Sequence, residues 1–222
     1  MPRIERGLGD NIVYHVINRG NGRREVFHKE KDYEAFLKLM KEAKERYPVK
    51  LYGYCLMPNH FHMAVKPEKG EDLSRWMQWL MTSHVRRYHR HHESSGHVWQ
   101  GRYKSFMIQE DSHLLMVLRY IEGNPVRAKL VQSAAEWRWS SHNETLGTRE
   151  RVLLDMSPIE LPEEWRLFVN EQFGETEIDR LRTSVNRQAP FGEATWQMQV
   201  CKTFGLDSTL RQRGRPKKVA QV

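Results

Sequence analysis

The stretch VKLYGYCLMPNHFHMAVKP, residues 49–67, predicts two strands joined by a tight turn. Both arms are rich in apolar and aromatic residues, and the PN pair between them suits a short turn, so we expect an antiparallel hairpin. Alternate side chains of a strand point to opposite faces, which puts His60 and His62 on one face and Phe61 and Met63 on the other. The hairpin therefore presents two histidines side by side at the start of its second strand.

Further strands and helices are expected on both sides of the hairpin. Periodicity and breaker residues predict a strand over 11–18, helices over 32–47 and 71–92, a short strand over 105–109 and a helix over 111–124. This order is the split β-α-β arrangement of a ferredoxin-like α+β fold with an antiparallel sheet. We expect the helices on one face of the sheet and the other face open. His60 and His62 would then lie on the open face, within reach of a substrate.

Two imidazoles on one strand face have two interpretations, which the residues alone leave open. They are either the polar side of a half-buried strand or two ligands of a metal ion. Asn124 could complete a His-His-Asn ligand set for Mg²⁺ or Mn²⁺, with Tyr120 one helical turn away beside a phosphate. Equally, Tyr120 could close an apolar core, and Asn124 could cap a short helix that begins at Pro125.

The charge balance favours a polyanionic partner. The 222 residues include 36 Lys and Arg against 28 Asp and Glu, a formal net charge of +8, and nucleic acid is the commonest partner of such a protein. Cys55 and Cys201 have the spacing of neither a metal site nor a disulfide framework, which fits a reducing compartment. The charged opening MPRIERGLGD and the absence of an 18-residue apolar run predict neither a signal peptide nor a membrane span. We expect a cytoplasmic, nucleoid-associated protein.

The chain is expected to have three parts. Residues 1–142 would form the catalytic domain, residues 143–205 a helical extension, and residues 206–222 a basic tail that is disordered until it binds DNA. Within the tail, the RGRP sequence at 213–216 resembles an AT-hook, whose arginines enter a narrow minor groove. A tail that only aids solubility is the alternative.

Three ordered motifs give the chain a family resemblance. They are YCLMPNHFHMAV at 54–65, GHVWQGRYKS at 96–105 and RYIEGNPVRAKLV at 119–131, the last of which is followed by WRWSS. Over roughly residues 8–142 the chain resembles the REP-associated tyrosine transposases, a branch of the single-tyrosine HUH transposases.

This resemblance implies roles for particular residues. It implies an HUH fold in which His60 and His62 hold a divalent metal, Mg²⁺ or Mn²⁺, and Asn124 is the third ligand. Tyr120 would be the nucleophile that forms a 5′-phosphotyrosine. Where the family often has a bulkier residue, this chain has Gly123, a departure that affects helix geometry more than chemistry.

Cationic and aromatic side chains suited to phosphate contact and base stacking complete the predicted site. We expect DNA contacts from Arg86, Arg87, Arg90, Trp99, Arg102, Tyr103, Lys104, Arg213, Arg215, Lys217 and Lys218. The alternative is a solvated helix end and a tryptophan buried in the core. The expected partner is single-stranded or hairpin DNA, bound by a monomer or a homodimer.

These expectations describe a metal-dependent, single-stranded DNA endonuclease and strand transferase, acting on hairpin-forming repeats as the resemblance implies. Two rivals remain: a DNA-binding regulator that keeps the fold with little catalysis, and a His-x-His metallohydrolase that uses water. A Tyr120→Phe substitution separates nuclease from hydrolase, because only the tyrosine nuclease needs the phenol. Either metal-bound water or His113 could accept the proton of Tyr120, and the sequence does not decide between them.

Overall fold

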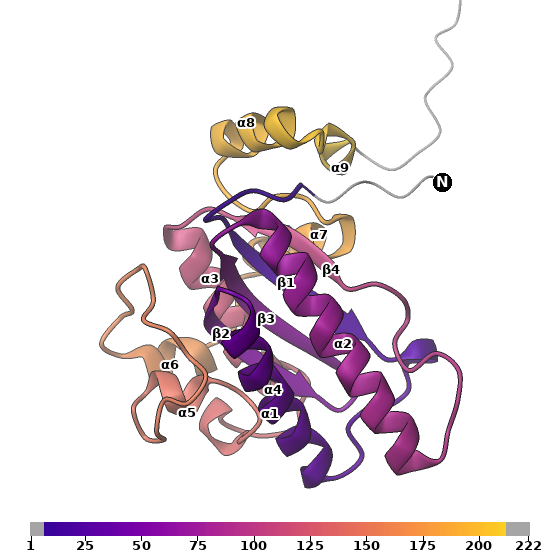
Figure 1. Ribbon diagram of the computed structural model, residues 1–222. Helices are drawn as coiled ribbons and strands as arrows, with labels where there is room; N and C mark the ends of the chain where they lie inside the picture. Colours follow the sequence, from indigo (N-terminus) through magenta and orange to yellow (C-terminus); the bar gives the residue numbers. More distant parts are fainter. Residues whose placement is uncertain (1–6, 212–222) are drawn as a thin grey trace, which may run out of the picture.

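The computed structural model describes residues 7–211, and a four-stranded antiparallel sheet forms its centre (Figure 1). The strands are β1 (Val13–Arg19), β2 (Val49–Met57), β3 (His60–Pro67) and β4 (Lys104–Ile108), in the spatial order β2-β3-β1-β4. β2 and β3 form the predicted hairpin, and β1 pairs antiparallel with both β3 and β4. This is the ferredoxin-like strand order, so the predicted α+β fold class is confirmed.

Two long helices cover one face of the sheet, as expected. α1 (Glu30–Arg46) and α2 (Gly70–His92) each bury an apolar stripe against β3. The buried residues of the stripes and of the facing strand include Phe36, Met40, Leu73, Trp76, Leu80, Phe61, Met63 and Val65. Asp32 and Asp72 fix the first turns, because each accepts the backbone N–H of the lysine before its helix, at 3.2 Å.

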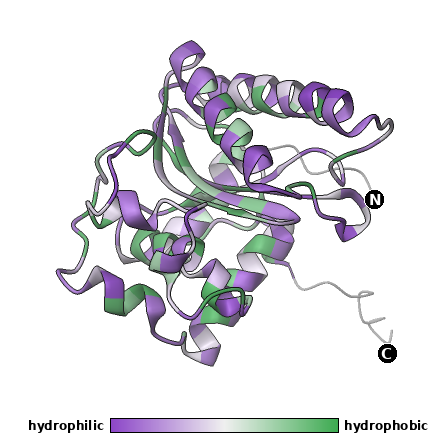
Figure 2. Cartoon of the chain, turned by 90° about the horizontal axis from the view of Figure 1, so that it is seen from below, coloured by the Kyte–Doolittle hydropathy of each residue, from purple (hydrophilic) through white to green (hydrophobic). Residues whose placement is uncertain are grey.

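The other face of the sheet is covered too, so the expectation of an open face is wrong. α3 (Ser112–Glu122) and α6 (Trp165–Asn170) pack on it, and Figure 2 shows helices on both sides of the sheet. The physical reason is that the strands are apolar on both faces. A second buried cluster contains Val13, Ile17, Cys55, Ala64 and Phe106 of the sheet with Leu114, Val117, Leu118 and Ile121 of α3 and Trp165 and Val169 of α6.

A glycine in β2 allows α3 to approach the sheet closely. A Cβ atom on Gly53 would lie 2.8 Å from Cδ2 of Leu118, closer than side chains tolerate. The register of β2 against β3 also shifts between Leu51 and Gly53, where a bulge bends the strand locally. A side chain at position 53 would therefore require Leu118 of α3 to move.

Residues after α3 fold onto this framework as short helices. They are α4 (Asn124–Arg127), α5 (His142–Thr145), α6, α7 (Glu175–Arg187), α8 (Ala194–Phe204) and α9 (Asp207–Leu210), with a 3-10 turn at Ala134–Glu136. Another 3-10 turn, at Asn21–Arg23, follows β1. Leu181 and Phe191 join the cluster under α3, whereas Val200 and Cys201 join the cluster under α1 and α2. The predicted extension 143–205 therefore shares both cores of the sheet domain.

The structure describes the predicted basic tail only as far as Arg211. Arg213, Arg215, Lys217 and Lys218 lie outside the described residues. Within residues 7–211, no helix is both long enough and apolar enough to cross a bilayer.

Candidate active site

The two histidines of the hairpin lie on the face of β3 that turns toward α3. His60 is opposite Arg19 of β1, and His62 is opposite Ile17. Their ring centroids are 5.1 Å apart. His62 is only 4% exposed, whereas His60, at the end of the strand, is half-buried. The predicted side-by-side arrangement is present, but it is partly enclosed by the helical layer.

A third histidine, His15 of β1, contacts His62. The two side chains meet through Nε2 of His15 and Nδ1 of His62 at 2.9 Å, in a fully buried position. Burial lowers the pKa of His15 to about 3 and the pKa of His62 well below its usual range, so both rings are neutral near pH 7. A neutral pair shares one proton across this bond, and when Nδ1 of His62 is the donor, its Nε2 keeps a free lone pair.

His60 has a polar partner of its own. Its Nδ1 lies 2.6 Å from the Asn59 side-chain oxygen, which can only accept, so Nδ1 carries the proton. Burial and then the nearby Arg19 charge lower the pKa of His60 to about 4. The neutral ring therefore presents the lone pair of Nε2. Two neutral imidazoles with the second nitrogen of each engaged are suited to hold a divalent metal.

Tyr120 of α3 lies beside the same histidines. Its ring centroid is 5.6 Å from that of His62 and 6.1 Å from that of His15. The predicted nucleophile and the predicted metal ligand thus come together within one chain.

Arg127 of α4 packs against the ring of Tyr120. Its guanidinium carbon lies 4.1 Å from the centroid of the Tyr120 ring, and its Nη2 donates to the Tyr120 carbonyl. Burial lowers the pKa of Arg127 to about 10, so the group stays charged at neutral pH. A fixed cation therefore lies next to the phenol ring.

Asn124 is buried and lies at the start of α4, after a break in the helix. α3 ends at Glu122, so Tyr120 and Asn124 belong to successive helices and not to one continuous turn. A Cβ on Gly123 would lie 2.9 Å from the carbonyl oxygen of Val169 and 3.0 Å from that of Arg119. The close contact with α6 explains why this chain has glycine between the two helices.

Glu122 anchors α3 to the segments that follow it. Its carboxylate is 1% exposed and accepts four hydrogen bonds. The donors are Ser141 Oγ at 2.7 Å, Thr145 Oγ1 at 2.6 Å, His142 Nδ1 at 2.7 Å and Trp165 Nε1 at 2.8 Å. This network holds the helix that carries Tyr120 against the WRWSS motif and α6.

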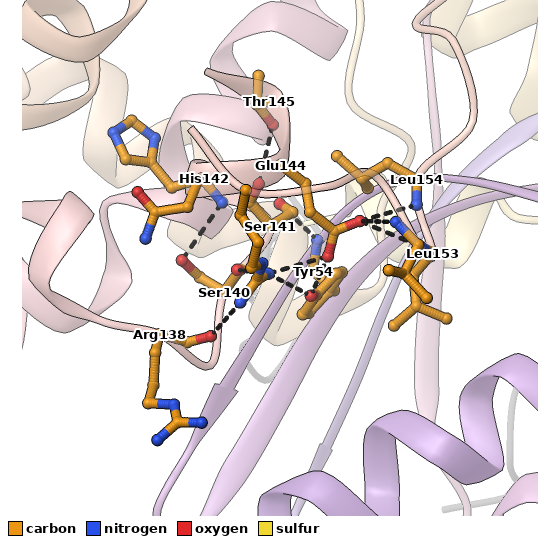
Figure 3. Close-up of polar contacts among 12 residues, drawn as sticks. Tyr54, Arg138, Ser140, Ser141, His142, Glu144, Thr145, Leu153 and Leu154 are labelled. Atoms are coloured by element: carbon orange, nitrogen blue, oxygen red, sulfur yellow. Dashed lines mark hydrogen bonds and ion pairs between the residues drawn. The ribbon is translucent and has the colours of Figure 1, made fainter. Parts of the chain in front are cut away.

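A second carboxylate, Glu144 of α5, ties the same segment to β2. Figure 3 shows it between Tyr54 and the backbone of Leu153 and Leu154. Burial by itself would raise the pKa of Glu144, but hydrogen bonds from Tyr54 and from the backbone lower it overall. Together Glu122 and Glu144 tie the segment around α5 to α3, α6 and β2.

The predicted DNA contacts divide into two groups. Arg86, Arg87, Arg90, Arg102 and Lys104 are exposed. Trp99 and Tyr103 are 5% and 7% exposed and belong to the core under α1 and α2. The indole N–H of Trp99 donates to Nδ1 of His84 at 3.2 Å, so this side chain offers no free face for a base.

A cavity of about 320 Å³ lies beside the last residues of β1, Ile17, Asn18 and Arg19. Its lining contains the cations Arg19, Arg102 and Lys104 and the amides Asn18, Gln100 and Asn186. Arg19 is the strand partner of His60, so the cavity adjoins the site. Its cations suit phosphates, and its amides suit base edges.

His113, a candidate proton acceptor, has polar and aromatic partners of its own near the start of α3. It begins α3 and pairs with Asp111, Nδ1 to Oδ1 at 2.7 Å. Seven residues separate it from Tyr120, which corresponds to about 10 Å along the helix axis. The ring of His113 packs on Phe191, whereas the ring of Tyr120 packs on His15 and His62, so the two side chains have different neighbours.

Comparison with known proteins identifies the family of this site. The sequence model of the family described as "Transposase IS200 like" matches residues 9–124, just over half of the 222 residues. The chain belongs to the IS200-like transposase family. The matched segment of this IS200-like chain contains the whole sheet and ends at Asn124, so it includes His60, His62 and Tyr120.

Two relatives of the IS200-like chain are informative. It is 27% identical over 117 residues to a Haemophilus influenzae protein whose name places it among the REP-associated tyrosine transposases. That alignment spans 48% of this chain and 66% of the relative, slightly less than two thirds of its length. A solved structure described as a REP-associated tyrosine transposase bound to a REP hairpin matches with a TM-score of 0.55 and 18% identity, over 78% of this chain and 96% of that one. This second likeness shows the shared fold.

Three residues of the site were not predicted from the sequence: His15, Arg19 and Arg127. His15 lies within the predicted first strand, and Arg19 directly follows it. The alternation of that strand already puts His15 on the other face from Tyr14 and Val16. What the sequence does not contain is the register that brings β1 beside β3. Arg127 lies within the RYIEGNPVRAKLV motif, which was the available signal.

Proposed function

We propose that the protein is a metal-dependent, single-stranded DNA endonuclease and strand transferase that acts through a covalent 5′-phosphotyrosine. The observation that carries this proposal is the 5.6 Å distance between the rings of Tyr120 and His62, with His60 adjacent in the same chain. Family membership supports the reaction class. A tyrosine beside paired neutral histidines is the arrangement that such a reaction needs.

The residues present fit a divalent metal. His60 and His62 would each bind it through Nε2, since the Nδ1 atoms are engaged by Asn59 and His15, and Asn124 would add an amide oxygen. Imidazole ligands favour Mn²⁺ over the harder Mg²⁺. When bound, the metal would orient the scissile phosphate and neutralise charge that develops on it.

The side chains of the protein account for the remaining steps. The phenol oxygen of Tyr120 attacks the phosphorus, and the bond from phosphorus to the 3′-oxygen breaks. The proton lost by the phenol is balanced by the proton gained at the 3′-hydroxyl. Arg127 holds the backbone and ring of Tyr120 and adds positive charge beside the phenol ring. Because the phosphotyrosine keeps the diester energy, a 3′-hydroxyl can attack it and rejoin a strand.

The proposed substrate is single-stranded DNA next to a hairpin-forming repeat. One structural neighbour is described as bound to a REP hairpin, which supports this choice. The cavity with Arg19, Arg102 and Lys104 would receive the strand that enters the site. Action on chromosomal repeats would bring the protein to the nucleoid.

The test is incubation with labelled hairpin DNA and Mn²⁺, followed by denaturing gel electrophoresis and intact mass measurement. We expect a covalent protein-DNA adduct from the wild type and from Tyr88→Phe, a matched control on α2, and none from Tyr120→Phe. Cleavage by Tyr120→Phe without an adduct would instead indicate a hydrolase that uses water. Hairpin binding without any cleavage would indicate a DNA-binding regulator.

A further inference from the structure

A second group of metal-binding side chains lies on the opposite face of the sheet from His60 and His62. Asp32, at the start of α1, meets His91 and His92, at the end of α2. One ligand atom from each of the three residues lies within 4.8 Å of the others. Nearly 60 positions of sequence separate the aspartate from the histidines, so it is the packing of the two helices that brings them together.

The aspartate is already oriented by the fold. Its Oδ2 accepts the backbone N–H of His28 at 2.9 Å and of Lys29 at 3.2 Å. Its other oxygen, Oδ1, is 3.7 Å from Nε2 of His92, too long for a hydrogen bond. The side chain is buried, with 7% exposed. The backbone fixes one oxygen of this carboxylate, and the other oxygen points at an imidazole. Such an orientation is typical of a carboxylate that binds a metal ion.

The two histidines lie close to each other and to a third histidine, His28. The ring centroids of His91 and His92 are 5.0 Å apart, and the ring of His28 lies 4.9 Å from His92. Nε2 of His28 is engaged by the Tyr88 hydroxyl at 2.9 Å, which fixes that side of the cluster.

The surroundings contain charges of both signs. Arg87 lines the small hollow between these residues, together with Val26, and the Lys29 charge acts on His92. The Asp32 carboxylate and the C-terminal end of α2 offset these positive charges, because the free carbonyls at a helix end attract a cation. Two imidazoles and one carboxylate are the ligand set of many Zn²⁺ sites and leave a position for water.

We propose that Asp32, His91 and His92 form a second metal site, for Zn²⁺ or a similar transition-metal ion, that ties the start of α1 to the end of α2. The site is separate from the proposed catalytic metal and does not depend on the proposed reaction. It would also add positive charge at the end of α2 that carries Arg87 and Arg90.

The test is calorimetric titration of Zn²⁺ into the full chain with His60→Ala and His62→Ala, which removes the proposed catalytic ligands. We expect one bound Zn²⁺, and affinity at least 10-fold weaker after His91→Gln and His92→Gln are added. The matched control adds His89→Gln and His97→Gln, which remove two other histidines from the same region and should leave the affinity unchanged. Asp32→Asn should also weaken binding while its amide oxygen keeps the two backbone hydrogen bonds.

Thermal unfolding gives an independent measurement. In the protein with its own His60 and His62, Zn²⁺ at 100 times the Kd of the second site should raise Tm by about 5 to 10 °C through that site. His91→Gln with His92→Gln should remove this part of the rise and should lower the number of bound ions by one. Unchanged Zn²⁺ affinity and stoichiometry in the His91→Gln, His92→Gln protein would overturn the proposal.

Discussion

At the scale of single residues, His15 determines which nitrogen of His62 can bind a metal. The 2.9 Å contact between them allows two proton arrangements. If His15 donates, neutral His62 must carry its proton on Nε2 and loses its metal lone pair. If His62 donates, Nε2 is free, and Nδ1 of His15, which is buried without a partner among the described residues, carries the other proton. We therefore expect metal binding to select the second arrangement.

This selection leads to a prediction for two variants of His15. Replacement by Leu removes the acceptor for Nδ1 of His62 and should weaken Mn²⁺ binding by about 10- to 100-fold. Replacement by Gln restores an acceptor oxygen at nearly the same place and should keep the affinity closer to wild type. Mn²⁺ titration followed by electron paramagnetic resonance measures both. Equal affinities for the two variants would contradict the role of His15.

His84 gives a prediction about pH. It is buried, accepts the indole N–H of Trp99, and has its pKa lowered to about 3, first by burial. An unfolded histidine has a pKa of about 6.5, so the unfolded chain takes up the proton first as the pH falls. The free energy of unfolding should be level above pH 6.5 and should fall below it by at most about 1.4 kcal/mol per pH unit from this residue.

Urea unfolding between pH 4 and 7 checks this prediction. His84→Phe should reduce the slope below about pH 6.5, whereas His97→Gln, at an exposed position, should leave it unchanged. An identical slope in His84→Phe would show that His84 does not stay neutral in the folded protein.

At the scale of elements, the sequence predicted the strands and the first three helices, because each has a clear local period. The hairpin, α1, α2 and the ferredoxin-like fold class were recovered from residues 11–124 alone. The helices on the second face of the sheet were not predicted, although the sequence of β2 indicates them. All but one of its nine residues are buried. A strand that is apolar on both faces is covered on both faces. What no local pattern contains is which distant helix supplies the cover.

Glu122 is the test of how that cover supports the site. Glu122→Gln leaves one acceptor oxygen for four donors, so either His142 and Trp165 or the hydroxyls of Ser141 and Thr145 face an amide NH₂ group and lose the carboxylate. We expect a loss of about 3 kcal/mol in the free energy of unfolding and slower adduct formation by Tyr120. Glu163→Gln, at an exposed position, is the matched control. Chemical unfolding curves and single-turnover cleavage measure the two effects, and wild-type values for both would contradict the supporting role.

At the scale of the whole molecule, the sheet separates two functions. The face under α3 and α6 encloses the proposed catalytic residues, and the face under α1 and α2 provides the larger core and carries the proposed second metal site. The net charge of +8 predicted a polyanionic partner but could not say where it binds. The fold narrows this choice, because it buries Trp99 and Tyr103 and leaves Arg102 and Lys104 in the lining of the cavity beside His60.

The position of Arg102 and Lys104 gives a prediction about how DNA affinity depends on salt concentration. If Arg102 and Lys104 contact phosphates, each releases counterions on binding, and the slope of log affinity against log salt concentration should become shallower by about 0.7 for each charge removed. Arg102→Gln with Lys104→Gln should therefore reduce the slope for single-stranded hairpin DNA by about 1.4. Lys38→Gln with Lys41→Gln, which removes two exposed cations of α1, makes the same change in net charge. Fluorescence anisotropy over a series of salt concentrations separates the two cases: equal reductions would mean that DNA responds to total charge, whereas a reduction confined to the first pair would place the strand in the cavity.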